Sequence, residues 1–153
     1  MVALDLTVFS DFISGGFVGS IYNYANIKNT SVHGAKVTVE GDMYIGGFIG
    51  SFSGTQTMGK LYIDNSYVYS VNYKGHVKLN NDGGNADIGG FIARINRVDD
   101  MSITNCFSCI VVEAVGTGVV QNAGGFAGYL FIEGTKGVIL NVIQVVIIEV
   151  NTM

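Results

Sequence analysis

The tripeptide Gly-Gly-Phe occurs four times in this chain of 153 residues, and each copy opens a similar longer phrase. After a variable stretch, each phrase reaches an isoleucine that stands two positions before an asparagine. A phrase that recurs at intervals of tens of residues is typical of a repeat architecture. The phenylalanines are Phe17, Phe48, Phe91 and Phe126, and the later pairs are Ile27/Asn29, Ile63/Asn65, Ile103/Asn105 and Ile139/Asn141.

The repeats begin near residues 15, 46, 89 and 124, so the intervals between them vary while the phrases stay constant. This combination predicts stacked strands with insertions at the corners. Each repeat offers three extended segments, which in the first repeat are residues 15–21, 25–32 and 35–40. No window has a helical period. We therefore predict an all-β fold: a single domain over residues 1–153, built as a parallel β-helix (β-solenoid) of about four coils with three short strands per coil.

The composition agrees with such a fold and excludes some functions. Proline is absent, as expected where every backbone N–H is needed in a sheet. The net charge is −4 and the basic residues are scattered, which argues against a nucleic-acid partner. The longest apolar stretch, residues 137–150, is too short and too polar for a membrane-spanning segment. The N-terminal residues lack the basic region of a signal peptide.

Stacking places equivalent side chains about 4.8 Å apart, which predicts ladders of phenylalanine, isoleucine and asparagine. We expect the asparagines to face inward, with amides that hydrogen-bond from one coil to the next. Asn29-Thr30-Ser31 matches a glycosylation sequon, but an inward Asn29 would be inaccessible.

The last strand is expected to be apolar on both faces. If Ile139 and Asn141 point inward, alternation also places Ile143 inward and leaves an aliphatic stripe outside. Soluble monomers seldom expose such a stripe, so we predict that a neighbouring subunit or repeat covers it. The predicted contact residues are Val138, Leu140, Val142, Val146 and Ile148.

The two cysteines, Cys106 and Cys109, lie in a segment that reads as a strand. Residues three apart in a strand point to opposite faces and lie beyond disulfide reach. We predict two independent structural cysteines, and the redox compartment stays open.

Tyrosines are frequent around the second repeat, and Tyr62 and Tyr67 are our candidates for a ligand-binding face. Cross-strand packing is the alternative interpretation. The other tyrosines of this group are Tyr22, Tyr24, Tyr69 and Tyr73.

Nothing in the sequence resembles a reaction centre. Asp99 and Asp100 with Arg94 and Arg97 form the densest charged cluster, which we interpret as a solvated corner with local ion pairs. Polysaccharide-active enzymes need clustered carboxylates, and here the carboxylates are dispersed. We predict no catalytic residue.

We also predict no metal or cofactor site. His33 and His76 both adjoin corner glycines, but no third ligand stands in register with them. The loop at residues 80–87 carries oxygen ligands suited to calcium, although turn chemistry alone explains it.

The repeated phrases resemble the GLUG-motif family of bacterial repeat proteins. Its units run Gly-Gly-(Leu/Phe)-(Val/Ile)-Gly, then Ile-x-Asn-(Ser/Cys) and a valine-containing strand, and the match spans about residues 13–150. Ala93, Ala127 and Val142 depart from this pattern. The resemblance implies a right-handed parallel β-helix in secreted or surface-attached proteins, commonly adhesins, whose repeats are not known as catalytic.

We therefore expect a non-catalytic structural or adhesive β-solenoid, extracellular or on the cell surface. The leading hypothesis is a subunit or segment of a fibre or surface layer that assembles end to end, because no sequence-distinct cap precedes the first repeat. The alternative is an adhesin module that binds a glycan or a protein through its tyrosine face. A polysaccharide-active enzyme is the third hypothesis.

Overall fold

The computed structural model describes residues 3–55, 59–71, 74–81, 83–145 and 148–150, without the side chains of residues 3–4, 135 and 144–150. These residues form strands β1 to β18 and no α-helix, so the fold is all-β as predicted. The described part of the chain thus contains no helix with the length and apolar character needed to cross a membrane.

The strands form three sheets, which we name A, B and C. Sheet A contains β1 (Ala3–Ser10), β5 (Ser31–Gly41), β9 (Tyr67–Ser70), β10 (His76–Asn80), β13 (Phe107–Cys109), β14 (Val111–Val115), β17 (Ile143–Val145) and β18 (Ile148–Val150). Sheet B contains β2 (Ile13–Gly15), β6 (Tyr44–Gly46), β11 (Asn85–Gly89) and β15 (Val119–Gly124). Sheet C contains β3 (Val18–Tyr22), β4 (Tyr24–Lys28), β7 (Ile49–Ser53), β8 (Gly59–Asp64), β12 (Ile92–Thr104) and β16 (Ala127–Leu140).

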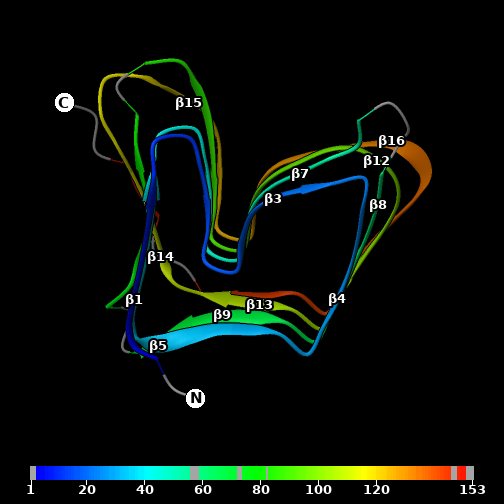
Figure 1. Cartoon of the computed structure of the whole chain (residues 1–153), viewed down its shortest axis with the longest axis horizontal. Coiled ribbons are helices and arrows are strands. Elements are labelled where there is room, and N and C mark those ends of the chain that lie inside the picture. The colour runs from blue at the N-terminus through cyan, green and yellow to red at the C-terminus, as the bar shows by residue number, and fades with distance from the viewer. Residues whose placement is uncertain (1–2, 56–58, 72–73, 82, 146–147, 151–153) are drawn as a thin grey trace.

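Every described strand pair is parallel, and the chain visits the sheets in the repeating order A, B, C. The strands of one sheet lie over one another in Figure 1, and their order follows the order of the repeats. Pairing aligns the first glycines of all four phrases, Gly15 with Gly46, Gly46 with Gly89, and Gly89 with Gly124. The repeated phrase therefore sets the register of the sheets.

At the Gly-Gly pairs the chain turns sharply from sheet B into sheet C, and this inward bend of the backbone, which we name the notch, points toward β9 and β13 (Figure 1). A Cβ on Gly46 would overlap the carbonyl oxygen of Ile49 within the same turn. A Cβ on Gly47 would overlap the carbonyl oxygen of Gly90 in the next repeat and would lie 3.3 Å from Cγ1 of Val68 in sheet A. The first glycine is needed because the turn closes tightly on itself, and the second because the next repeat and sheet A lie close to it.

The phenylalanines of the four phrases form a stacked ladder, as predicted. Their ring centroids lie 4.9, 4.6 and 4.8 Å apart in sequence order. Phe48 and Phe91 are fully buried at the centre of the core. The isoleucines of the later phrases are also in register, Ile27 with Ile63, then Ile103, then Ile139. These two ladders make the core continuous from one repeat to the next.

The asparagine ladder exists, but the prediction that it faces inward is wrong. Asn29, Asn65, Asn105 and Asn141 are exposed, with φ of 52°, 47°, 53° and 53°, at the corner between sheets C and A. Asn tolerates this left-handed conformation better than most residues. Asn65 donates to Oδ1 of Asn29 at 2.8 Å and Asn141 to that of Asn105 at 3.1 Å, whereas Asn105 donates to Asp64. Asn29 of the sequon is therefore accessible.

The left-handed asparagine also interrupts the alternation of faces, so the next residue points inward. Ser66 and Cys106 are buried at this position, and each hydrogen-bonds the carbonyl oxygen two residues before it. Val142 at the same position packs partly buried against the core, and Ile143 is 66% exposed. Our prediction had Val142 outside and Ile143 inside, and it is wrong for both.

Candidate functional site

The two ends of the stack are the first candidate surface. We name β1, β2, β3 and β4 the leading edge, and β15, β16, β17 and β18 the trailing edge. Within the described residues, each of these strands pairs with a neighbour on one side only. The other side presents backbone N–H and C=O groups with which a further strand could pair.

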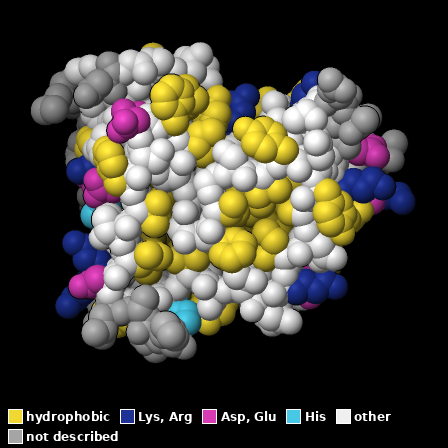
Figure 2. Space-filling view, viewed as in Figure 1, with side chains coloured by type: hydrophobic (Ala, Val, Ile, Leu, Met, Phe, Trp, Pro, Cys, Tyr) yellow, Lys and Arg dark blue, Asp and Glu magenta, His cyan; other side chains and the backbone are white. Residues whose placement is uncertain are grey.

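Aromatic side chains are uncovered at the leading edge. Phe17 is 49% exposed although its ladder partner Phe48 is fully buried, because no ring among the described residues stacks on its outer face. Phe9 and Phe12 are 63% and 64% exposed. Figure 2 shows hydrophobic side chains gathered across the middle of the viewed face.

The trailing edge is aliphatic. Val138 and Leu140, which we predicted to point outward, are 47% and 57% exposed on β16. Ile139 continues the isoleucine ladder and is 43% exposed because its strand is the last in sheet C. Of the other predicted contact residues, Val146 and the side chain of Ile148 lie outside the described residues.

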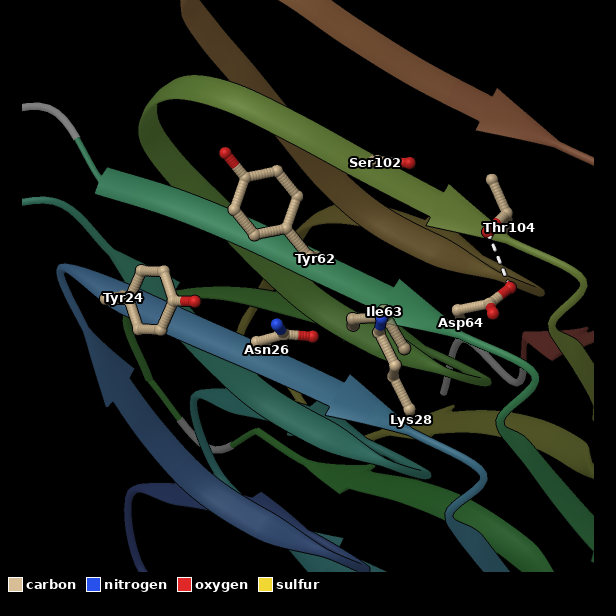
Figure 3. A pocket seen from close by; sticks show the side chains of 8 residues that line it. All are labelled: Tyr24, Asn26, Lys28, Tyr62, Ile63, Asp64, Ser102 and Thr104. Atoms are coloured by element: carbon tan, nitrogen blue, oxygen red, sulfur yellow. Dashed lines mark hydrogen bonds between the residues drawn. The ribbon is translucent and has the colours of Figure 1, made fainter.

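A groove on the outer face of sheet C is the second candidate. Its volume is about 370 Å³, and the outward side chains of β4, β8 and β12 line it (Figure 3). The strands are in register, so Asn26, Tyr62 and Ser102 form one row and Lys28, Asp64 and Thr104 form the next. Tyr24 and Ile63 complete the lining.

Hydrogen bonds hold two groups of this groove in place. Oδ1 of Asp64 accepts from the Thr104 hydroxyl at 2.8 Å and from the Asn105 amide at 2.9 Å. These two donors, with a smaller effect of the Lys28 charge, lower the pKa of Asp64. The Tyr62 hydroxyl donates to Asp100 at 2.8 Å, and this hydrogen bond raises the pKa of Tyr62.

The predicted ligand face is divided between two sheets. Tyr62 lies in the groove beside Tyr24, with ring centroids 6.3 Å apart. Tyr67 lies in sheet A beyond the Asn65 corner, where its ring stacks on Phe107 at 4.6 Å. Tyr73, which we grouped with these, lies outside the described residues.

Sequence reasoning missed the polar members of the groove, although a signal for them was present. Lys28, Asp64 and Thr104 are the central residues of the Ile-x-Asn phrases, and Asn26, Tyr62 and Ser102 immediately precede the isoleucines. Since the isoleucines point inward, the residues on either side point outward and stack in rows.

The charged cluster is divided too. Arg94 pairs with buried Asp87 at 2.7 Å and lies between the rings of Tyr44 and Tyr129, 4.9 and 4.4 Å from their centroids. Arg97 lies 3.7 Å from Glu133, and Asp100 accepts from Tyr62. Arg94 thus joins the two walls of the notch instead of forming a site with Asp99 and Asp100.

The remaining candidates lie apart from one another. His33 contacts the Ser31 hydroxyl at 3.0 Å, whereas His76 lies 3.2 Å from Glu40. The side chain of Asn81 bonds the backbone of the loop at residues 80–87, as in a turn. Across the described residues, no three His, Cys, Asp or Glu side chains could hold one metal ion.

Both cysteines are free, in agreement with the prediction. Cys106 is buried at the corner between β12 and β13, and Cys109 is partly exposed at the end of β13, so the single strand that we expected through both cysteines is interrupted. Burial raises the pKa of Cys106.

Comparisons with models of protein families, with curated proteins and with solved structures find no match to this chain.

Proposed function

We propose that the three sheets form a parallel β-helix of four coils, and that this helix is a structural segment extended end to end by further coils outside the cell. The aligned Gly-Gly-Phe phrases and the repeating order of sheets A, B and C support the β-helix. The resemblance of the phrases to GLUG-motif repeats supports an extracellular or surface location. Each coil carries one segment in each sheet.

One observation carries the proposal: the phenylalanine ladder is open at the leading edge and the isoleucine ladder at the trailing edge. Phe17 leaves about half of its ring exposed, while the same position is buried in the next three repeats, and at the trailing edge Ile139 is 43% exposed. Covering about 100 Å² of apolar surface there would contribute about 2.5 kcal/mol. The exposed aliphatic residues and free backbone groups of the trailing edge add to the attraction for another coil.

The two edges are heterologous surfaces, because the leading edge of one copy faces the trailing edge of the next. Contacts of this kind produce open filaments instead of closed dimers. The resulting particle is a fibre whose length depends on concentration.

The three sheets do not all have the same number of strand layers, and this difference determines how two copies can meet. Sheets B and C each stack four layers, whereas β1 adds a fifth layer to one half of sheet A. If the β1 strand of a second copy paired with β18, one strand layer would be missing between the two copies in sheets B and C. The gap would be about 4.8 Å, the spacing between neighbouring strands. Contact between the two copies in all three sheets therefore requires that β1 detach from β5.

Sedimentation velocity and electron microscopy over a range of concentrations test the proposal. We expect association that increases with concentration and that Phe17→Asp at the leading edge weakens. Leu6→Asp is expected to strengthen it, because Leu6 of β1 packs against the core and its loss releases β1. Tyr69→Asp, on the outer face of sheet A, is the matched control and should have no effect.

A protein that stays monomeric at all concentrations, in the wild type and in Leu6→Asp alike, would contradict end-to-end extension. Association that Phe17→Asp leaves unchanged would place the contact elsewhere on the molecule.

A further inference from the structure

The groove on sheet C combines features of a ligand-binding site. It lies on the outer face of sheet C, and although its strand β4 belongs to the leading edge, a further coil would pair with the backbone of β4 and leave the outward side chains accessible. Its volume of about 370 Å³ falls in the range of small-molecule sites. Aromatic and polar side chains face it from three neighbouring strands.

The side chains are divided into two ends. Figure 3 shows the rings of Tyr24 and Tyr62 at one end, and Lys28, Asp64 and Thr104 at the other. Tyr24 is 58% exposed and so presents much of its ring to solvent. An apolar face of a ligand can pack on such a ring, while polar groups of the same ligand reach the far end.

Several polar groups of the groove are free to bind a ligand. In the described part of the chain, the side chains of Asn26, Lys28 and Ser102 make no hydrogen bond or ion pair. Asp64 engages one carboxylate oxygen with Thr104 and Asn105, which leaves Oδ2 available. Together these groups supply both donors and acceptors.

The charges indicate the class of ligand. Among the residues that line the groove, the ammonium of Lys28 stands in the same row as the carboxylate of Asp64, so the lining carries no net charge. A phosphate or a polyanion would meet Asp64, and nucleic acid would require several more cations. A ligand with many hydroxyl groups and one apolar face matches a set of amide, hydroxyl, carboxylate and aromatic groups.

We propose that this groove binds a neutral saccharide, with a sugar ring packed on the Tyr24 and Tyr62 end and hydroxyl groups bonded to Asn26, Lys28 and Asp64. The inference is independent of end-to-end extension, because it concerns a different face of the molecule. The groove is open and shallow, so we expect Kd values of about 0.1–1 mM for a short oligosaccharide.

Chemical-shift titration of the ¹⁵N-labelled protein with cellohexaose, chitohexaose, maltohexaose and mannohexaose tests the proposal. We expect at least one sugar to shift the amide signals of β4, β8 and β12. Tyr62→Ala and Asp64→Asn should each weaken binding about tenfold. Tyr62→Phe, which keeps the ring and loses only the bond to Asp100, should change affinity less than about threefold.

Tyr67→Ala is the matched control, since it removes a tyrosine from sheet A and should leave binding unchanged. Thermal melting of each variant separates loss of binding from loss of the fold. Absence of any shift with all four sugars at about 10 mM would overturn the proposal. Shifts confined to other strands, or equal losses from the substitutions at Tyr62 and Tyr67, would also overturn it.

Discussion

The notch makes a sharp prediction about stability, because its second glycine has no room for a methyl group. In Gly47→Ala, the new Cβ would overlap the carbonyl oxygen of Gly90 in the next repeat. The neighbouring backbone must move by about 1 Å to admit it, in a core that is closely packed. Two backbone hydrogen bonds bracket this point, from Gly47 to Gly89 at 3.2 Å and from Phe48 to Phe91 at 2.8 Å.

The expected loss follows from these contacts. Overpacking of a tight site destabilises by about 1–3 kcal/mol. Weakening two buried backbone hydrogen bonds adds about 1 kcal/mol each. Gly47→Ala should therefore lower the free energy of unfolding by about 3–5 kcal/mol. This is a large part of the total free energy of unfolding of a typical domain, which is about 5–15 kcal/mol. The melting temperature should fall by about 10 °C.

Urea denaturation followed by circular dichroism measures this loss. Gly83→Ala is the matched control, because a Cβ at Gly83 meets no atom within 4 Å. That variant should be unchanged or more stable by about 0.5 kcal/mol, since alanine restricts the unfolded chain. A Gly47→Ala protein within about 1 kcal/mol of the wild type would refute the reasoning, because the loss expected from overpacking and weakened hydrogen bonds would be missing.

Two further predictions concern single side chains. Thr104→Val should raise the pKa of Asp64 toward its ordinary value in an NMR titration, because it removes the leading cause of the lowering, while Ser102→Ala should not. In the wild type, the stabilisation by ionised Asp64 is complete above the ordinary aspartate pKa and is lost as the pH falls through the lowered one. A thiol reagent should modify Cys109 in the folded protein, whereas it should modify Cys106 only after unfolding. Rapid reaction of both thiols without urea would contradict the described burial.

The fold was largely predictable because the positions of the repeated phrases indicate which residues of neighbouring strands pair. Each Gly-Gly-Phe phrase marks one layer, so the stacking of Phe48 on Phe91 followed from the sequence, as did the parallel direction of the strands. The direction of the asparagines was not predictable by the same means. Alternation holds only while the backbone stays extended, and at Asn65 and its equivalents φ is positive.

The candidate groove could be predicted only in part. Tyr62 was identified as a ligand-face residue, but its expected partner Tyr67 lies around the corner on another sheet. The true neighbours of Tyr62 in the groove, Asn26 and Ser102, come from the preceding and following repeats. Cross-strand neighbours of this kind become visible only when the phrases are aligned position by position.

The sequence by itself determined the layers of this protein: four repeats, their register, and the phenylalanine and isoleucine ladders of the core. These features are local patterns copied along the chain, and stacking of like on like follows from the spacing of parallel strands. Only the tertiary structure decided where one outer surface ends and the next begins, because that depends on where each corner turns the backbone. The groove beside Asp64 is a consequence of that three-dimensional path, because the corner at Asn65 places Tyr67 on sheet A, away from Tyr62.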